Sequence, residues 1–136
     1  MVIRVLNDVL SHTDADPSRV YLIGYSMGGY GAWELAIQYP EQFAAVVPVA
    51  GGGDPERVGA LKHVPIWAVH GANDKGVPPE ESLEMIAALR AAGGTPRYSE
   101  LKGVGHPAVG PGLINSDEVI RWMFAQVLGV PSNASH

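Results

Sequence analysis

A short glycine-rich segment, Gly24-Tyr25-Ser26-Met27-Gly28-Gly29, constrains the fold of this chain more than any other feature. It follows the apolar run 20–23 and opens a segment with the character of a helix. A serine flanked by glycines between a strand and a helix is typical of a nucleophile elbow, a turn so tight that the serine backbone is strained. The pattern predicts that Ser26 lifts its hydroxyl clear of a sheet, beside the free N–H groups that begin the helix.

The length of the chain, 136 residues, suits one domain with one core. We expect that domain to span residues 1–130 and residues 131–136 to form a loose tail. Acidic side chains outnumber Lys and Arg by 14 to 9, and no basic cluster occurs. Nucleic acid and anionic membrane surfaces are therefore not expected as partners. No window of the sequence is long and apolar enough to predict a membrane span.

The amino-terminal segment and the absence of cysteine bear on the compartment of the protein and on the kinds of site it can contain. Residues 1–6 turn polar too soon for a signal peptide, so the compartment stays open, with the cytoplasm as the default expectation. A chain without cysteine has no disulfide, no thiolate zinc site and no cysteine nucleophile.

Helix-like and strand-like segments alternate along the chain. Helices are expected at 2–10, 30–38, 55–61, 79–92 and 113–128, and strands at 20–24, 43–50, 64–70 and 96–101. This alternation, with nearly all-apolar strands, predicts an α/β fold: about four parallel strands with right-handed crossovers and helices on both faces. Two helix faces are expected in the core: Leu83, Ile86, Ala87 and Leu89 or the Arg90 stem, and Ile120, Phe124, Val127 and Leu128.

Two further polar residues follow strands in the order that a serine nucleophile needs. Asp74 lies in the loop after the strand 64–70, and His106 lies in the loop after the strand 96–101. Because parallel strands end at the same edge of a sheet, Ser26, Asp74 and His106 are expected on one rim. A serine needs a base for its proton, and that base needs an acid to fix its tautomer.

Four motifs carry a resemblance to a known superfamily: the segment 16–21, the elbow 24–29, the segment 70–78 (His-Gly-x-x-Asp-x-x-Val-Pro in outline) and the pair 105–106. They resemble the carboxyl-terminal part of an α/β-hydrolase, nearest to esterases of the dienelactone-hydrolase, polyester-depolymerase and phospholipase/carboxylesterase kind. The resemblance implies that Ser26 is the nucleophile, Asp74 the acid and His106 the base, with the backbone N–H of Met27 as one oxyanion donor. It also implies a serine carboxylesterase acting on small to medium acyl esters through an acyl-enzyme on Ser26, without a metal or organic cofactor.

The chain departs from that superfamily before the elbow. Relatives have more strands there, and a loop among them supplies the second oxyanion N–H. Here one helix precedes the elbow strand, so a truncated α/β-hydrolase fold is expected, with the strand 20–24 as an exposed edge. Such an edge favours a homodimer or a higher homo-oligomer. Aggregation, or origin as a fragment of a longer gene product, are the alternatives.

Several alternatives stay open at this point. Asp54 could replace Asp74 as the acid, although a turn before Pro55 also explains it. His70 is expected to hold the Asp74 loop by hydrogen bonds rather than to act as a base. Tyr25 could pack against the protein or line an acyl pocket. As functions, a vestigial hydrolase half serving as a binding or assembly module and a peptidase of the prolyl-oligopeptidase type remain beside the esterase.

Overall fold

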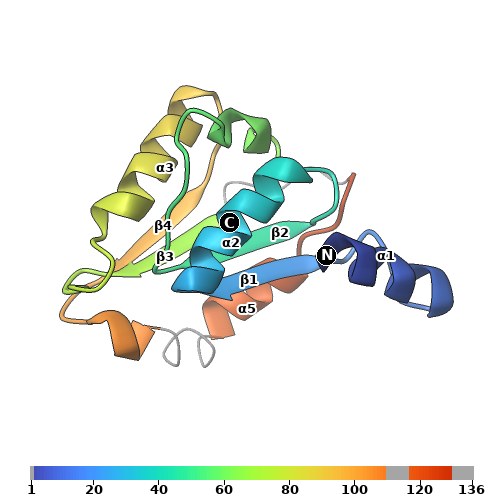
Figure 1. Cartoon of the computed structure of the whole chain (residues 1–136), viewed down its shortest axis with the longest axis horizontal. Helices are drawn as coiled ribbons and strands as arrows, with labels where there is room; N and C mark the ends of the chain where they lie inside the picture. Colours follow the sequence, from blue (N-terminus) through green and yellow to red (C-terminus); the bar gives the residue numbers. More distant parts are fainter. Residues whose placement is uncertain (1, 110–116, 130–136) are drawn as a thin grey trace.

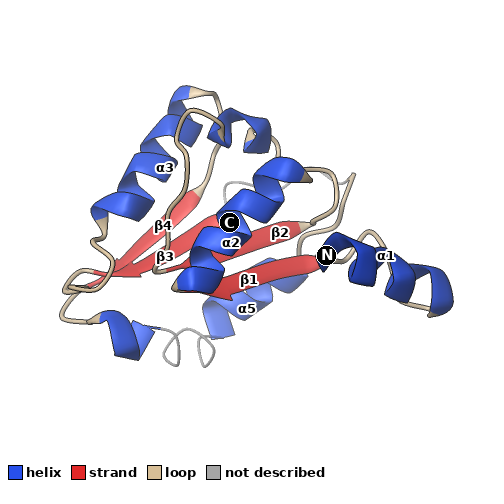
Figure 2. Ribbon diagram, in the orientation of Figure 1, coloured by secondary structure: helices blue, strands red, loops and turns tan. Residues whose placement is uncertain are grey.

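The computed structural model describes residues 2–109 and 117–129, and a parallel sheet forms its centre. Its strands are β1 (Tyr21–Tyr25), β2 (Ala45–Val49), β3 (Trp67–Gly71) and β4 (Arg97–Leu101), side by side in chain order. Figure 2 shows the strand arrows pointing in one direction. The helices are α1 (Val2–His12), α2 (Met27–Gln38), the 3-10 turn η1 (Val58–Leu61), α3 (Glu80–Ala91) and α5 (Asp117–Phe124). The predicted α/β fold with four parallel strands is confirmed.

Helices cover both faces of the sheet. The helices α2 and α3 and the turn η1 lie on one face, and α5 lies on the other (Figure 1). The residues of β2 alternate between these layers: Val46 belongs to the same core cluster as Trp33 of α2, whereas Val47 belongs to the cluster that contains Met123 of α5. Every residue of β2 is buried, which explains why this strand has no polar face.

The strand β1 forms one edge of the sheet, and α1 extends away from it (Figure 1). In β1, Ile23 is 43% exposed and Tyr25 39%, in contrast to the buried β2. The helix α1 has no buried residue. Its exposed apolar side chains are Val2, Val5 and Val9. An apolar helix face and an apolar strand edge therefore lie open in the part of the chain that the structure describes.

The inward face of α3 is not the predicted one. Leu83 and Ala87 are exposed, so those two assignments were wrong. The buried residues are Ser82, Met85, Ile86 and Leu89. The helix is rotated by about one residue from the prediction: Met85 is buried instead of Leu83, and the hydroxyl of Ser82 meets polar partners inside the core, as described below.

The last helix also differs from the prediction. It ends at Phe124, which is 55% exposed, rather than at Leu128. The Ala125 N–H closes the last turn on the carbonyls of Arg121 and Trp122. Beyond it the Leu128 N–H donates to the distant Ser18 carbonyl, so by that point the chain has left the helical path. The predicted start of this helix at 113 and the predicted tail 131–136 lie outside the described residues.

Candidate active site

The elbow places Ser26 between β1 and α2 in a conformation that is unusual for a residue with a side chain. Its backbone has φ 60° and ψ −113°, in a sparsely populated region that costs about 1–3 kcal/mol. The N–H of Ser26 donates to the Val49 carbonyl of β2 at 2.8 Å, and the Ser26 carbonyl accepts from the N–H groups of Gly29 and Tyr30. The strain that the glycine pattern predicts is present, and the sheet and the helix hold it from both sides.

Two glycines of the elbow have no room for a side chain. A Cβ on Gly24 would lie 1.9 Å from the carbonyl oxygen of Gly28, and one on Gly29 would lie 2.5 Å from the carbonyl oxygen of Val49. Gly28, by contrast, has no atom within 4 Å of its Cβ position. The first turn of α2 thus lies directly against the ends of β1 and β2, which brings Ser26 to the rim of the sheet.

His106 connects Ser26 to Asp74 through its two ring nitrogens. It follows β4 and begins the helical turn 106–109. Its Nε2 lies 2.8 Å from Ser26 Oγ, and its Nδ1 lies 2.6 Å from Asp74 Oδ2. Because a carboxylate only accepts, the proton is on Nδ1, and Nε2 of the neutral ring can accept the serine proton. The three residues singled out by the sequence form one continuous chain of hydrogen bonds.

Asp74 lies in the loop between β3 and α3, with its side chain shielded from solvent. Its Oδ1 accepts the N–H groups of Gly76 at 2.9 Å and Val77 at 2.8 Å. Burial acts to raise the pKa of this carboxyl, but the Val77 N–H, the His106 ring and the Gly76 N–H together hold the pKa below its ordinary value. Asp74 is therefore a fixed, charged carboxylate at neutral pH, suited to orienting an imidazole.

His70 holds the Asp74 loop against the body of the fold, as the sequence led us to expect. The fully buried ring donates from Nε2 to the Val77 carbonyl at 2.8 Å, and the same nitrogen lies 3.4 Å from Asp74 Oδ2. Its Nδ1 lies 2.7 Å from Ser82 Oγ, which lies 3.1 Å from the carbonyl oxygen of Gly51. No motif singles out Ser82; a serine among the apolar residues of a helix is the only signal for it.

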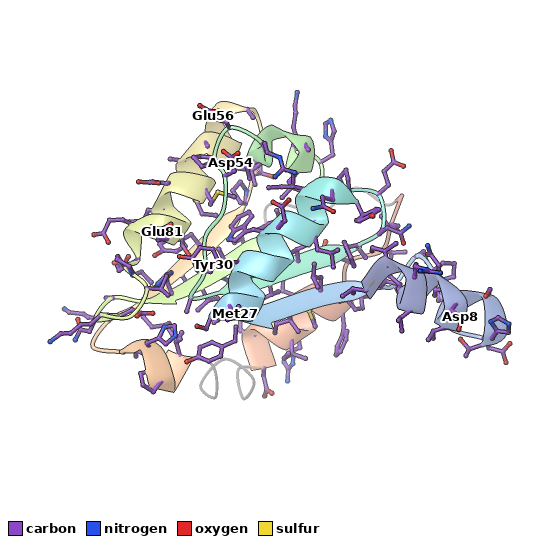
Figure 3. The ribbon with its side chains drawn as sticks, in the orientation of Figure 1. Asp8, Met27, Tyr30, Asp54, Glu56 and Glu81 are labelled. Atoms are coloured by element: carbon purple, nitrogen blue, oxygen red, sulfur yellow. The ribbon has the colours of Figure 1, made fainter. Side chains whose placement is uncertain are left out.

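Asp54, the alternative acid, makes local contacts. Its Oδ1 accepts the Glu56 N–H at 2.9 Å, and its carbonyl accepts the Arg57 N–H at 3.1 Å, which is a turn ahead of η1. Figure 3 shows Asp54 and Glu56 well apart from Met27, the residue next to Ser26. The structure therefore brings Asp74, and not Asp54, to His106.

Two tyrosines border the elbow. The Tyr25 ring stacks on the His106 ring, with centroids 5.3 Å apart and planes 27° apart, and its hydroxyl donates to the His106 carbonyl at 2.5 Å. Tyr30 lies one turn into α2, toward Glu81 (Figure 3). Burial and the charges of Glu81 and Asp74 raise the pKa of the Tyr30 phenol. Tyr25 thus packs against the histidine, and polar groups border the elbow on the side of α3.

Met27 provides one backbone donor beside Ser26. It is the first residue of α2, and its side chain is 86% exposed (Figure 3). The first N–H groups of a helix have no carbonyl partner within the helix, so the Met27 N–H is free for a ligand. Within residues 2–20 the helix α1 is the one element that precedes β1, and it presents no loop comparable to the one that supplies a second donor in relatives.

Two hollows of the described surface lie away from these residues. One, of about 380 Å³, lies at the amino-terminal edge of the sheet beside Phe43 and Val64. Another, of about 320 Å³, lies between α1 and α2 beside Val2 and Leu35. Neither is lined by Ser26.

Residues 2–109 and 117–129 lack two further features. They contain no group of three or more His, Asp or Glu side chains that could hold a metal ion. No helix in these ranges combines the length and the apolar character needed to cross a membrane.

Comparison with known proteins finds esterases. The bifunctional acetylxylan esterase/xylanase XynS20E of Neocallimastix patriciarum is 37% identical over 76 residues, which is 54% of this chain and 11% of the relative. Poly(3-hydroxyalkanoate) depolymerase C of Paucimonas lemoignei is 37% identical over 49 residues, which is 36% of this chain and 12% of the relative. A crystal structure of a thermostable esterase superposes with a TM-score of 0.88 at 35% identity, covering 93% of this chain and 36% of that one.

The chain spans only a part of these relatives, between 11% and 21% of the length of the curated proteins it matches. The model of the dienelactone hydrolase family nevertheless matches residues 2–109, most of the chain. The match covers β1 to β4, the elbow, Asp74 and His106. On this evidence the chain belongs to the dienelactone hydrolase family.

Proposed function

We propose that this protein is a serine carboxylesterase that hydrolyses small to medium acyl esters. The observation that carries the proposal is the chain of hydrogen bonds from Ser26 to His106 at 2.8 Å and from His106 to Asp74 at 2.6 Å. Membership of the dienelactone hydrolase family and the similarity to an acetylxylan esterase and a polyester depolymerase support it. All of these names refer to the cleavage of a carboxylic ester.

The proposed reaction begins when Ser26 Oγ attacks the ester carbonyl carbon while His106 Nε2 takes the hydroxyl proton. The imidazolium donates that proton to the leaving alkoxide, which departs as an alcohol. The acyl group remains bound to Ser26. Water then gives a proton to Nε2, attacks the acyl carbon and releases the acid as Oγ regains its proton. Asp74 holds the histidine tautomer and stabilises the imidazolium in both halves.

The Met27 N–H is the proposed oxyanion donor. It lies at the start of α2, where the positive end of the helix dipole faces the developing negative charge. Loss of one such donor costs roughly a hundred- to a thousandfold in kcat in a comparable hydrolase, so this N–H is expected to contribute substantially to the rate.

The first test is turnover of p-nitrophenyl acetate and butyrate by the purified protein and by Ser26→Ala. The variant should lose at least about a thousandfold in kcat, because the acyl-enzyme cannot form. The matched control is Ser11→Ala, an exposed serine on α1, which should keep full activity. A fluorophosphonate probe should label Ser26 once per chain; labelling at Ser82 or Ser99 would contradict the assignment.

The acid is tested with a matched pair of amides. Asp74→Asn should lower kcat by about 10⁴-fold, since the wrong imidazole tautomer results. Asp54→Asn should leave kcat unchanged, because its carboxylate caps a local turn. The reverse result would assign the acid to Asp54.

We further propose that the protein forms a homodimer through β1. The supporting observations are the position of β1 at the edge of the sheet, the exposure of Ile23 and the open apolar face of α1. Unpaired strand edges of this kind seek another strand. A two-fold axis beside β1 would extend the sheet and cover both surfaces.

Light scattering at micromolar concentration tests this proposal. Wild type should give the mass of a dimer, and Ile23→Lys should give the mass of a monomer, because the lysine charge would be buried at the contact. Leu83→Lys, at an exposed site on α3, is the control and should leave the dimer intact. A wild-type monomer that unfolds cooperatively would contradict the proposal.

A further inference from the structure

Ser26 and His106 come from opposite edges of the sheet. Ser26 follows β1 and His106 follows β4, with β2 and β3 between them, so the ladder of the sheet does not join their backbones directly. The 2.8 Å approach of Nε2 to Oγ therefore depends on contacts made across the rim. Asp74 supplies one contact, at Nδ1, and a ring held by a single hydrogen bond can still swing about it.

Tyr25 supplies two further contacts. Its ring stacks on the imidazole, with centroids 5.3 Å apart and planes 27° apart, and its hydroxyl donates to the backbone carbonyl of His106 at 2.5 Å. The Tyr25 side chain is 39% exposed and belongs to neither apolar cluster of the described core. Its position is thus explained by the contact with His106 and not by core packing.

We propose that Tyr25 is a positioning residue for His106. Its hydroxyl fixes the histidine backbone, and its ring fixes the tilt of the imidazole over Ser26. The inference rests on the proposed function, in which His106 is the base. The elbow would then contain both the nucleophile, Ser26, and the preceding residue, Tyr25, whose side chain keeps His106 in line with Ser26.

The ring has a second consequence for the reaction. When His106 takes the serine proton, its imidazole becomes a cation between two groups, the Asp74 carboxylate at Nδ1 and the Tyr25 ring on its face. Aromatic faces attract cations within about 6 Å of the ring centroid. The stack therefore favours the charged state that forms in the transition state, in addition to orienting the neutral ring.

The two contacts can be separated by substitution. Tyr25→Phe removes the hydroxyl and keeps the ring, whereas Tyr25→Leu removes both. Tyr21 is the matched control, because it lies on the same strand, and its hydroxyl also donates to backbone carbonyls, those of Phe124 and Gln126. Tyr21 lies at the other end of β1, and its ring makes an aromatic contact of its own with Phe124, with ring centroids 5.3 Å apart.

We expect Tyr25→Phe to lower kcat for p-nitrophenyl acetate by roughly three- to tenfold, as for the loss of one hydrogen bond. Tyr25→Leu should lower it by roughly ten- to a hundredfold, with KM unchanged, as expected when a reacting group is misplaced. Tyr21→Phe and Tyr21→Leu should keep kcat at any temperature where they are folded. In proton NMR spectra, the His106 Nδ1–H signal should broaden or shift in Tyr25→Leu and stay unchanged in Tyr21→Leu.

Three results would overturn the proposal. The first is a normal kcat and a normal His106 signal in Tyr25→Leu. The second is a raised KM with unchanged kcat, which would make Tyr25 a substrate contact. The third is a loss of kcat that follows the melting temperature equally in the Tyr25 and Tyr21 variants. If wild type neither hydrolyses esters nor reacts with the probe, the proposed function fails, and the NMR comparison alone decides the role of Tyr25.

Discussion

Replacing Gly24 with alanine should destabilise the fold far more than the same change at Gly28, although both glycines belong to one motif. A Cβ at position 24 would lie 1.9 Å from the carbonyl oxygen of Gly28 and 2.4 Å from its carbonyl carbon. Both atoms belong to the backbone of the first turn of α2, so no side-chain rotation relieves the contact. At Gly28 the new methyl group meets no atom within 4 Å.

The size of the effect follows from these distances. To restore an ordinary carbon–oxygen contact, the first turn of α2 must move by about 1.5 Å from the end of β1. Overpacking a core costs about 1–3 kcal/mol, and a clash between two backbones lies at or above the upper end, so we expect a loss of at least about 3 kcal/mol. Gly28→Ala replaces a helical glycine and should gain about 0.5–1 kcal/mol.

Urea unfolding followed by tryptophan fluorescence measures the difference. With a slope of about 2 kcal/mol per molar, the midpoint should fall by about 1.5 M in Gly24→Ala and rise by about 0.3 M in Gly28→Ala. Equal midpoints in the two variants would refute the reasoning, because they would mean that the close approach of α2 to β1 is not a feature of the folded protein.

Three further changes test other parts of the structure. In α3, Leu89→Ala should lower the free energy of unfolding by about 2–5 kcal/mol and Leu83→Ala by much less, because Leu89 is 1% exposed and Leu83 42%. Equal urea midpoints in the two variants would mean that Leu83 is also a core residue. Ser82→Ala should cost about 1–3 kcal/mol, because His70 and the Gly51 carbonyl lose a buried partner, and a midpoint equal to that of Ser11→Ala would contradict this. Folded Asp74 keeps its charge to a lower pH than unfolded Asp74, so the stability it contributes is complete above the ordinary pKa of 3.8 and is lost as the pH falls through its lower folded value. Urea midpoints measured from neutral to strongly acidic pH should therefore fall less in Asp74→Asn than in wild type; parallel curves would show that Asp74 gains nothing on folding.

The sequence alone determined the fold class and predicted the residues of the candidate site. Strand, tight turn and helix are local in sequence, so the elbow around Ser26 could be recognised from a few consecutive residues. The positions of Asp74 and His106 followed from topology, because residues just after parallel strands meet at one edge of the sheet. The choice of Asp74 over Asp54 needed the resemblance to a family as well, since a turn could explain either residue.

Only the tertiary structure decided how the elements are rotated and which side chains meet. Apolar residues occupy much of the circumference of α3, so periodicity did not fix its inward face. In the structure that face carries Met85, Ile86 and Leu89 together with Ser82, which is bonded to His70. The two roles left open for Tyr25 are likewise indistinguishable in sequence, because the contact joins positions on opposite edges of the sheet. Local sequence patterns indicate where the chain turns and which residues share one face of a helix or strand. Contacts between distant segments depend on how whole elements pack together, and no short stretch of the chain encodes this packing.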